Sequence, residues 1–241
     1  KWNNSGWVVN AEKLKIVNGS FQNDKYTERA PYKHFDGMHI LFSGINGTLE
    51  NILFLNDTLS AKLDISAKER SGFEVKKLQS DMRFTPDLME FKNLDLQTNR
   101  SRLGNYYAMR YNKFNSDMGR FISKVSLEAD FKETVLNSDD IAFFAPALKN
   151  WKRVFNIEGI AKGTVDDFTA KNLKVRSGSS YIDGNLSMTG LPDINSTFID
   201  LKANSLQTNF TDLALIIPAI KNNPTPAFNK LGIINYKGTF T

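Results

Sequence analysis

The sequence contains no cysteine, only two histidines and no long apolar run, and each absence excludes a class of function. Without cysteine there is neither a disulfide framework nor a cysteine-based zinc site. No apolar stretch approaches the roughly 20 residues that a membrane-spanning helix needs, and no signal peptide is recognisable. Absence of cysteine suits the cytosol and equally suits a periplasmic protein that avoids oxidation errors. The cysteine content therefore does not distinguish between these two compartments.

The scarcity of histidine also argues against metal binding and acid–base catalysis. His34 and His39 flank Asp36, but a metal held there would lack further histidine or cysteine ligands. The carboxylate pairs Asp139-Asp140 and Asp166-Asp167 fit a helix start and a turn without any catalytic role. No nucleophile-elbow, phosphate-loop or dinucleotide motif occurs. We predict that the chain is not an enzyme, with no catalytic residues, no metal and no cofactor.

The net charge of +5 does not point to nucleic acid, because the lysines are scattered singly along the chain. One stretch, from Arg102 to Phe114, interleaves cations with aromatic residues, which could stack on bases or sugars. An edge strand whose cations extend to water explains the same pattern, and we favour that interpretation. We therefore predict no nucleic-acid partner.

What the sequence does contain is an alternation of apolar and polar residues with a period of two. It is clearest in Leu59–Lys68, Lys124–Lys132, Tyr181–Thr189 and Phe198–Asn204. Each stretch has one apolar and one polar face, as expected of an antiparallel sheet. Short hairpins joining neighbouring strands are predicted at Asn18-Gly19, Asn46-Gly47, Ser71-Gly72, Ser177-Gly178 and Leu191-Pro192-Asp193.

The apolar members of this alternation are the candidate functional residues. Leu, Ile, Val, Met and Phe repeated at every second position form a continuous apolar row on one face of a sheet. The predicted lining residues are Leu59, Ala61, Leu63, Ile65, Met82, Phe84, Val125, Leu127, Ala129, Phe131, Ile182, Leu186, Met188, Ile199, Leu201 and Ala203.

Parts of the sequence recur. Ala170–Met188 resembles Phe91–Met109, and Ile217–Asn222 resembles Ala145–Asn150, with offsets in the seventies. The tripeptide Gly-Thr-hydrophobe also occurs three times, starting at Gly47, Gly163 and Gly238. A period of this size, built of strands, is typical of a protein that grows by adding similar units. Such proteins form long surfaces more often than a single catalytic pocket.

The alternation slips by one residue in both copies of the repeat. In the first copy Phe91 is followed by Leu94, and in the second copy Ala170 is followed by Leu173. Each pair is three positions apart, an odd number, instead of the two or four that alternation requires. An odd step would turn the apolar face over, so we predict a β-bulge or tight bend at the asparagine inside each pair, Asn93 and Asn172.

Helical patterns are few and short. Ser138-Asp139-Asp140 is a candidate N-cap for a helix over Ile141–Lys149, and Thr211-Asp212 begins a second helix that carries Ile220. A proline late in each, at Pro146 and Pro218, predicts short or kinked helices. A third candidate covers 116–123.

The predicted organisation has four parts. Residues 1–58 form a leading β segment, 59–150 and 151–222 two repeats that each end in a short helix, and 223–241 the start of a further repeat. The chain opens on Lys1 rather than Met and ends within the strand-like run Ile233–Thr241. We expect a segment of a longer protein.

The predicted fold class is mainly β, an elongated, curled antiparallel sheet of repeated strand meanders with a few short helices. Such helices, at ~1.5 Å per residue, can cover only part of the apolar face. The remainder must face a second sheet, a curl of the same sheet or an apolar ligand, because a large bare apolar patch is unusual. A closed sandwich and an open groove are both compatible with the pattern.

An ordered series of short motifs carries a resemblance to a known family. The motifs are Asp57-Thr58-Leu59-Ser60, the run Lys68 to Glu74, Asn93 to Thr98, Leu103 to Tyr106, Asp140 to Pro146, and Gly190 to Asp193. In this order they resemble the N-terminal to middle region of TamB-type translocation and assembly module proteins of Gram-negative bacteria, in the AsmA-like superfamily. The resemblance runs from about Trp7 to Asn222, and none of its motifs is catalytic.

The resemblance implies a periplasmic protein that an N-terminal helix, absent from this sequence, anchors in the inner membrane. It implies a β-groove with an apolar interior, as in bridge-like lipid transfer proteins, that carries phospholipid by its acyl chains between the inner and outer membranes. A C-terminal domain that works with an outer-membrane barrel partner has no match here. The runner-up function is a chaperone-like or structural module that assists outer-membrane protein assembly by strand addition. A glycan-binding sandwich is a more distant alternative.

Overall fold

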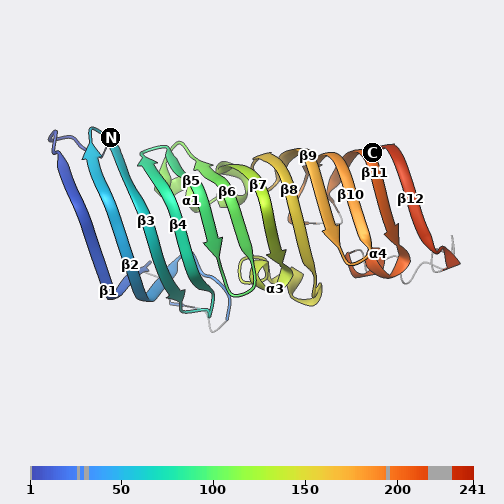
Figure 1. Ribbon diagram of the computed structural model, residues 1–241, viewed down its shortest axis with the longest axis horizontal. Helices are drawn as coiled ribbons and strands as arrows, with labels where there is room; N and C mark the ends of the chain where they lie inside the picture. Colours follow the sequence, from blue (N-terminus) through green and yellow to red (C-terminus); the bar gives the residue numbers. More distant parts are fainter. Residues whose placement is uncertain (1, 26–27, 30–32, 194–195, 217–229) are drawn as a thin grey trace.

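The strands of the protein pair in the order in which they follow one another, so every connection joins neighbours. The computed structural model describes residues 2–25, 28–29, 33–193, 196–216 and 230–241 (Figure 1). One antiparallel sheet contains β1 (Val9–Asp24), β2 (His39–Leu55), β3 (Thr58–Glu69), β4 (Glu74–Thr85), β5 (Leu88–Gln97), β6 (Arg102–Arg110), β7 (Ser126–Asn137), β8 (Val154–Gly163), β9 (Asp167–Ser177), β10 (Ser180–Thr189), β11 (Phe198–Asn209) and β12 (Ile233–Phe240).

The predicted fold class is confirmed. The chain is mainly β and forms a single curved, open antiparallel sheet with a few short helices. The four alternating stretches correspond to β3, β7, β10 and β11, although β7 and β11 extend beyond the clear alternation, to Asn137 and Asn209. The sheet passes without a break across the boundaries predicted after residues 58 and 150, since β2 pairs with β3 and β7 with β8. The boundary after residue 222 lies outside the described residues.

Three of the five predicted hairpin turns are correct and two are wrong. Ser71-Gly72 lies between β3 and β4, and Leu191-Pro192-Asp193 lies between β10 and β11. Ser177 ends β9, and Gly178 begins the turn to β10. Asn18-Gly19 and Asn46-Gly47 instead lie inside β1 and β2. Asn18 has a φ of 50° and Gly47 a φ of 144°. The residue types that favour tight turns also favour bulges, because both structures need positive φ.

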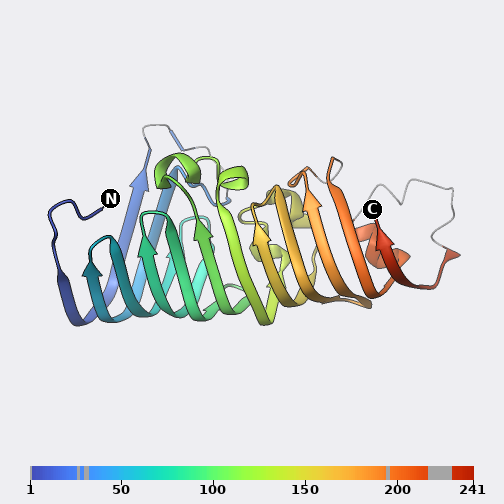
Figure 2. The same cartoon turned by 90° about the horizontal axis from the view of Figure 1, so that it is seen from above.

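Bulges cross the whole sheet. Every neighbouring pair of strands contains a shift of register within its length. In the two sequence repeats the shifts occur at Asn93 and Asn172, each with a φ of 52°, which confirms the predicted bulges. Asparagine is one of the few residue types that adopts this conformation readily. Because a bulge bends its strand, the series curls the sheet, and Figure 2 shows strand ends rising on the side where helices lie.

Two glycines allow neighbouring strands to come close where they bend. A Cβ on Gly47 would lie 2.0 Å from the carbonyl oxygen of Asp64 on β3. A Cβ on Gly184, in β10, would lie 2.2 Å from the carbonyl oxygen of Lys202 on β11. No side chain fits at such distances, so these positions require glycine.

The helices lie in the connections at the strand ends. They are α1 (Phe114–Met118) and α2 (Phe121–Lys124) before β7, α3 (Ser138–Ile141) and the 3₁₀ helix η1 (Pro146–Asn150) before β8, and α4 (Phe210–Ile216) after β11. The helix predicted over Ile141–Lys149 is therefore wrong in extent. Its α-helical part ends at Ile141, and Pro146 opens a separate 3₁₀ turn. Pro218 and Ile220, like the sequence repeat in 217–222, lie outside the described residues.

Equivalent asparagines cap the helices that follow β7 and β11. The Asn137 side chain accepts a hydrogen bond of 2.9 Å from the Asp139 N–H at the start of α3. The Asn209 side chain accepts one of 2.8 Å from the Asp212 N–H at the start of α4. The N-cap of α3 is thus Asn137, one residue before the predicted Ser138.

An aspartate in each of these helices also holds a hairpin turn. Asp140 in α3 accepts a hydrogen bond from the Thr98 hydroxyl and one of 2.8 Å from the Arg100 N–H, between β5 and β6. Asp212 in α4 accepts bonds of 3.2 and 2.8 Å from the N–H and hydroxyl of Ser179, between β9 and β10. The two repeats therefore share a strand meander, a capped helix and a carboxylate that fixes the neighbouring turn.

Candidate functional site

The apolar face of the sheet brings the sequence-predicted residues together. In β3 and β4 the cross-strand partners are Leu59 with Phe84 and Ala61 with Met82, while Ile65 lies opposite Leu78. Ala61, Leu63 and Met82 form a cluster of buried apolar residues, against which Leu49 and Phe91 pack from β2 and β5. One surface therefore runs continuously across four strands.

The same face continues through the middle of the sheet. Leu127 lies opposite Met109 and Ala129 opposite Tyr107, both on β6, and Phe131 lies opposite Gly159 on β8. Val125 precedes β7 and is fully buried at the end of α2, where its N–H bonds to the Phe121 carbonyl. Val125 is therefore not accessible on this surface.

The C-terminal part of the face is built in the same way. Met188 lies opposite Ile199 and Leu186 opposite Leu201, between β10 and β11. Ala203 lies opposite Gly184, and Ile182 lies opposite Leu206, also on β11. All six residues predicted in this part therefore share one face.

Sequence reasoning missed several members of the apolar face, some of which stand next to bulges. The missed members of the apolar face include Leu49, Leu78, Phe91, Leu94, Tyr107, Met109, Ala170 and Leu173. In β5 the bulge at Asn93 keeps Phe91 and Leu94 on the same face, although their spacing is odd. The odd spacing in the alternation was the signal that could have found them. A bulge at that point leaves the apolar residues before and after it on the same face of the sheet.

No second sheet covers this face in the part of the chain that the structure describes, since all its strands belong to one sheet. A closed sandwich needs two sheets, so the structure favours the open alternative. The central side chains are nevertheless buried, because the sheet curls and its own residues pack on one another. Toward the two edge strands the same face becomes exposed, with Phe21 in β1 at 53% and Phe240 in β12 at 59%.

An aromatic cluster joins the connecting segments at one end of the strands. Phe143 and Phe144, which follow α3, contact Phe73 with ring centroids 5.7 and 5.0 Å apart. Phe144 also contacts Phe35, in the segment before β2, at 5.1 Å. The cluster ties three segments that are distant in sequence to one end of the strands, where each aromatic pair adds about 1 kcal/mol beyond its burial.

The apolar face carries a tyrosine whose hydroxyl stays neutral. Tyr107 lies between Phe91 on β5 and Ala129 on β7. Burial raises the pKa of Tyr107 to about 12, so its hydroxyl stays protonated to a higher pH than that of an ordinary tyrosine, which is itself neutral at pH 7. This position therefore adds no charge to the apolar surface.

The opposite face is polar and carries ion pairs that link consecutive strands. Arg83 on β4 pairs with Glu90 on β5 at 2.8 Å, and the Tyr106 hydroxyl on β6 donates to Glu90 at 3.1 Å. Arg110 on β6 and Lys162 on β8 both pair with Glu128 on β7, at 3.0 and 2.9 Å. The stretch from Arg102 is therefore an internal strand of the sheet, and the edge-strand interpretation is wrong. Its cations pair with carboxylates of the neighbouring strands.

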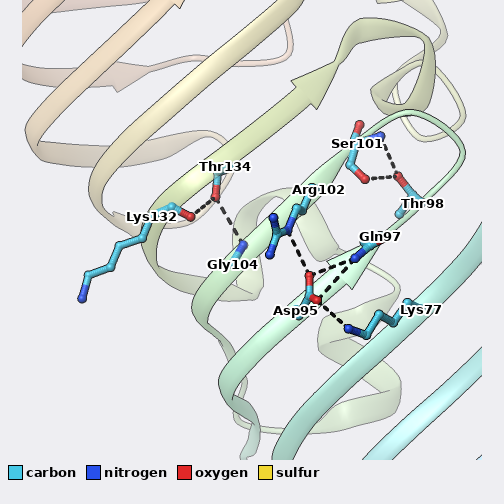
Figure 3. Close-up of polar contacts among 9 residues, drawn as sticks. All are labelled: Lys77, Asp95, Gln97, Thr98, Ser101, Arg102, Gly104, Lys132 and Thr134. Carbon is cyan, nitrogen blue, oxygen red and sulfur yellow. Dashed lines mark hydrogen bonds and ion pairs between the residues drawn. The ribbon is translucent and has the colours of Figure 1, made fainter.

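A second set of polar contacts lies near the turn between β5 and β6 (Figure 3). Asp95 accepts hydrogen bonds from Lys77 on β4 at 2.8 Å and from Arg102 on β6 at 3.1 Å. The Thr134 hydroxyl on β7 accepts from the Gly104 N–H and donates to the Lys132 carbonyl, each at 3.4 Å. Thr134 is buried beside the bulge at Glu133, so these bonds satisfy backbone groups that the bulge removes from the regular ladder.

These ion pairs predict a loss of stability in acid. The hydrogen bond from Lys77 lowers the pKa of Asp95. Burial opposes the charged form of Glu90, but Arg83, Tyr106 and Lys92 outweigh it and lower its pKa. A carboxylate with a lowered folded-state pKa stabilises the protein above its unfolded pKa of about 4 and loses that contribution as pH falls. We expect the urea midpoint to fall between about pH 5 and pH 3.

The control for this prediction removes one carboxylate of the ion pairs on the polar face. Glu90→Gln keeps the shape of the side chain, and the urea midpoint of this variant should change less with pH over the same window. An unchanged pH dependence in the variant would show that Glu90 is not one of the groups responsible.

The titratable side chains of the described residues are dispersed over the sheet. Those residues contain no group of three or more His, Asp or Glu side chains placed to hold a metal ion. His39, at the start of β2, has its Nδ1 atom 2.7 Å from a carboxylate oxygen of Asp36, within hydrogen-bond distance. Two hollows lie over the polar face, one lined by Lys62, Asp64 and Asp81 and another by Glu158, Lys174 and Arg176. Among the helices that the structure describes, none is long and apolar enough to span a membrane.

Comparison of the chain with protein-family models, curated proteins and solved structures returns no match. The resemblance to TamB-type proteins consequently rests on the sequence motifs alone.

Proposed function

We propose that the apolar face binds the acyl chains of phospholipids, and that the chain is a segment of a periplasmic envelope protein that carries phospholipid between the inner and outer membranes. The observation that carries this proposal is a continuous apolar face on one open sheet, with no second sheet over it in the described residues. An acyl chain gains about 0.8 kcal/mol for each CH₂ removed from water. A row of Leu, Ile, Met and Phe side chains supplies that environment without a deep pocket that would retain one lipid.

The ends of the sheet support the same proposal. At β1 and β12 the apolar face stays accessible, as the exposed Leu14, Phe21 and Phe240 show. An accessible apolar surface at both ends of a curled sheet suits a ligand that moves along it. The implied partners are the two membranes, through segments outside this sequence: an N-terminal anchor at the inner membrane and an outer-membrane barrel protein at the other end.

The proposal is tested by lipid mass spectrometry of the purified chain. We expect phospholipid to co-purify with the wild-type protein and to be lost from Leu127→Asp, because a charge at this half-buried site of the apolar face disfavours acyl contact by at least about tenfold. Asn185→Asp is the matched control. It introduces the same charge on the exposed polar face of β10 and keeps the oxygen that accepts the Asn172 N–H.

Thermal unfolding separates lipid loss from misfolding. A second variant, Leu186→Asp in β10, places the charge at another half-buried site of the apolar face. Wild-type protein without phospholipid, or a folded Leu127→Asp and Leu186→Asp that both retain it, would contradict the proposal.

The second candidate function is strand addition during outer-membrane protein assembly. It is favoured by the outer edges of β1 and β12, which pair with no other strand among the described residues and whose backbone groups could pair with an extended segment. This function uses edge hydrogen bonds rather than the apolar face. Crosslinks from edge positions to barrel proteins, with Leu127→Asp fully active, would favour it over lipid carriage.

A further inference from the structure

Among the tyrosines that the structure describes, only Tyr107 has a hydroxyl that forms no hydrogen bond with another described residue. The hydroxyls of the other four bond to protein acceptors, which are Glu90 for Tyr106, the Thr85 carbonyl for Tyr111, Asp183 for Tyr181 and the Thr239 carbonyl for Tyr236. A donor held away from water without an acceptor is costly, and most such groups in proteins are paired. The Tyr107 hydroxyl can therefore serve an acceptor that a ligand brings.

Tyr107 lies on the apolar face, where a ligand can reach it. Its cross-strand neighbours are Phe91 on β5 and Ala129 on β7. Part of the residue is accessible, while protein surrounds its hydroxyl closely enough that burial raises the pKa of Tyr107 to about 12. The hydroxyl is thus a neutral donor in apolar surroundings.

The row of cross-strand neighbours continues from Tyr107 through three alanines. Ala129 on β7 lies opposite Ala161 on β8, and Ala161 lies opposite Ala170 on β9. Beyond them the row returns to a larger side chain, Leu186 on β10. Neighbouring strands are about 4.8 Å apart, so single methyl groups occupy about 10 Å of the row. The shortest side chains of the row therefore stand directly beside the Tyr107 ring.

The surroundings of the hydroxyl fit a neutral acceptor. On the same face, Phe91 and the next residues along β5 and β7, Met89 and Leu127, carry no charge, and neither do the three alanines. A phosphate or carboxylate placed there would leave water without a counter-charge, which is strongly unfavourable. A carbonyl oxygen carries no charge and accepts a hydrogen bond. In a phospholipid, carbonyl groups stand at the ester linkages, where the acyl chains begin.

We propose that Tyr107 donates a hydrogen bond to an ester carbonyl oxygen of the bound phospholipid, whose glycerol region lies over Ala129, Ala161 and Ala170. This inference rests on the proposed function and adds to it a preference for lipids with acyl esters. A lipid with ether linkages has nearly the same shape and apolar area but lacks the carbonyl group. Because it leaves the hydroxyl unpaired, it should bind about tenfold more weakly, the ratio that one hydrogen bond supplies.

A competition between two lipids tests the role of Tyr107. The purified chain is incubated with vesicles that contain equal amounts of ester-linked phosphatidylethanolamine and its ether-linked analogue, and mass spectrometry measures both lipids bound to the protein. We expect an ester-to-ether ratio of about ten for the wild-type chain and about one for Tyr107→Phe. Tyr106→Phe is the matched control, because it removes the hydroxyl of the adjacent residue on the polar face. Its ratio should stay near ten.

Urea denaturation of the lipid-free chain separates ligand binding from a structural role. Tyr107→Phe should leave the urea midpoint unchanged or raise it, because the hydroxyl has no partner among the described residues. Tyr106→Phe should lower the midpoint, since it loses the hydrogen bond to Glu90. A lower midpoint in Tyr107→Phe as well would show that its hydroxyl supports the fold, and would overturn the proposal.

The competition also distinguishes this inference from the proposed function. A wild-type chain that binds both lipids equally, or a Tyr107→Phe chain that keeps the tenfold preference, overturns the role of Tyr107 and leaves lipid binding standing. A folded wild-type chain that binds neither lipid overturns both.

Discussion

Replacing Gly47 by alanine is expected to destabilise the sheet by about 3 kcal/mol, because the new Cβ collides with a neighbouring strand. That Cβ would lie 2.0 Å from the Asp64 carbonyl oxygen and 2.7 Å from the Ile65 Cα, both backbone atoms of β3 that cannot rotate away. The φ of 144° adds strain for any residue with a side chain. Urea denaturation monitored by circular dichroism measures the loss.

Gly44, in the same strand, is the matched control. It also has positive φ, 57°, but a Cβ built on it meets nothing within 4 Å. Gly44→Ala therefore isolates the cost of the backbone conformation, about 1 kcal/mol. Equal losses of stability in the two variants would show that the sheet does not depend on the close approach of β2 and β3 at Gly47.

Replacing Asp212 by alanine is expected to cost about 2 kcal/mol and to free α4 from the sheet. Its carboxylate is nearly buried and accepts hydrogen bonds from Ser180 at 2.8 Å and from Arg153 at 2.6 Å, besides those from Ser179. Burial opposes its charged form, but these donors outweigh it and lower the pKa of Asp212. Its removal leaves the Arg153 guanidinium partly buried without a counter-charge. Hydrogen exchange of the β9–β10 turn and urea denaturation measure the effect.

Asp139→Ala is the control for Asp212. Asp139 also begins a helix and pairs with two cations, but Arg100 and Lys152 are mostly exposed. Surface pairs of this kind contribute little, so the urea midpoint should move less than in Asp212→Ala. Asp212 would not be the residue that holds the β9–β10 turn if hydrogen exchange in that turn became fast in Asp139→Ala. The same conclusion would follow if exchange there did not become faster in Asp212→Ala.

The strand pattern and its slips could be predicted from the sequence, and the reason is local. Alternation in β3 and β10 follows from the two-residue period of an extended chain, which no distant contact needs to establish. The slips at Asn93 and Asn172 predicted bulges because an odd step would otherwise expose apolar residues. Asn18-Gly19 and Asn46-Gly47 misled the turn prediction, since only the pairing of β1 with β2 distinguishes a bulge from a turn.

The sequence by itself determined that this protein has a two-faced, repeating antiparallel sheet, because period-two hydrophobicity and turn residues act within a few positions along the chain. Tertiary structure alone decided that all the described strands join one curled sheet, that its apolar face is not covered by a second sheet, and that Asp140 and Asp212 tie helices to hairpin turns. These features depend on contacts between residues far apart in sequence. An apolar strand face looks the same in sequence whether a sheet, a helix or a ligand lies against it.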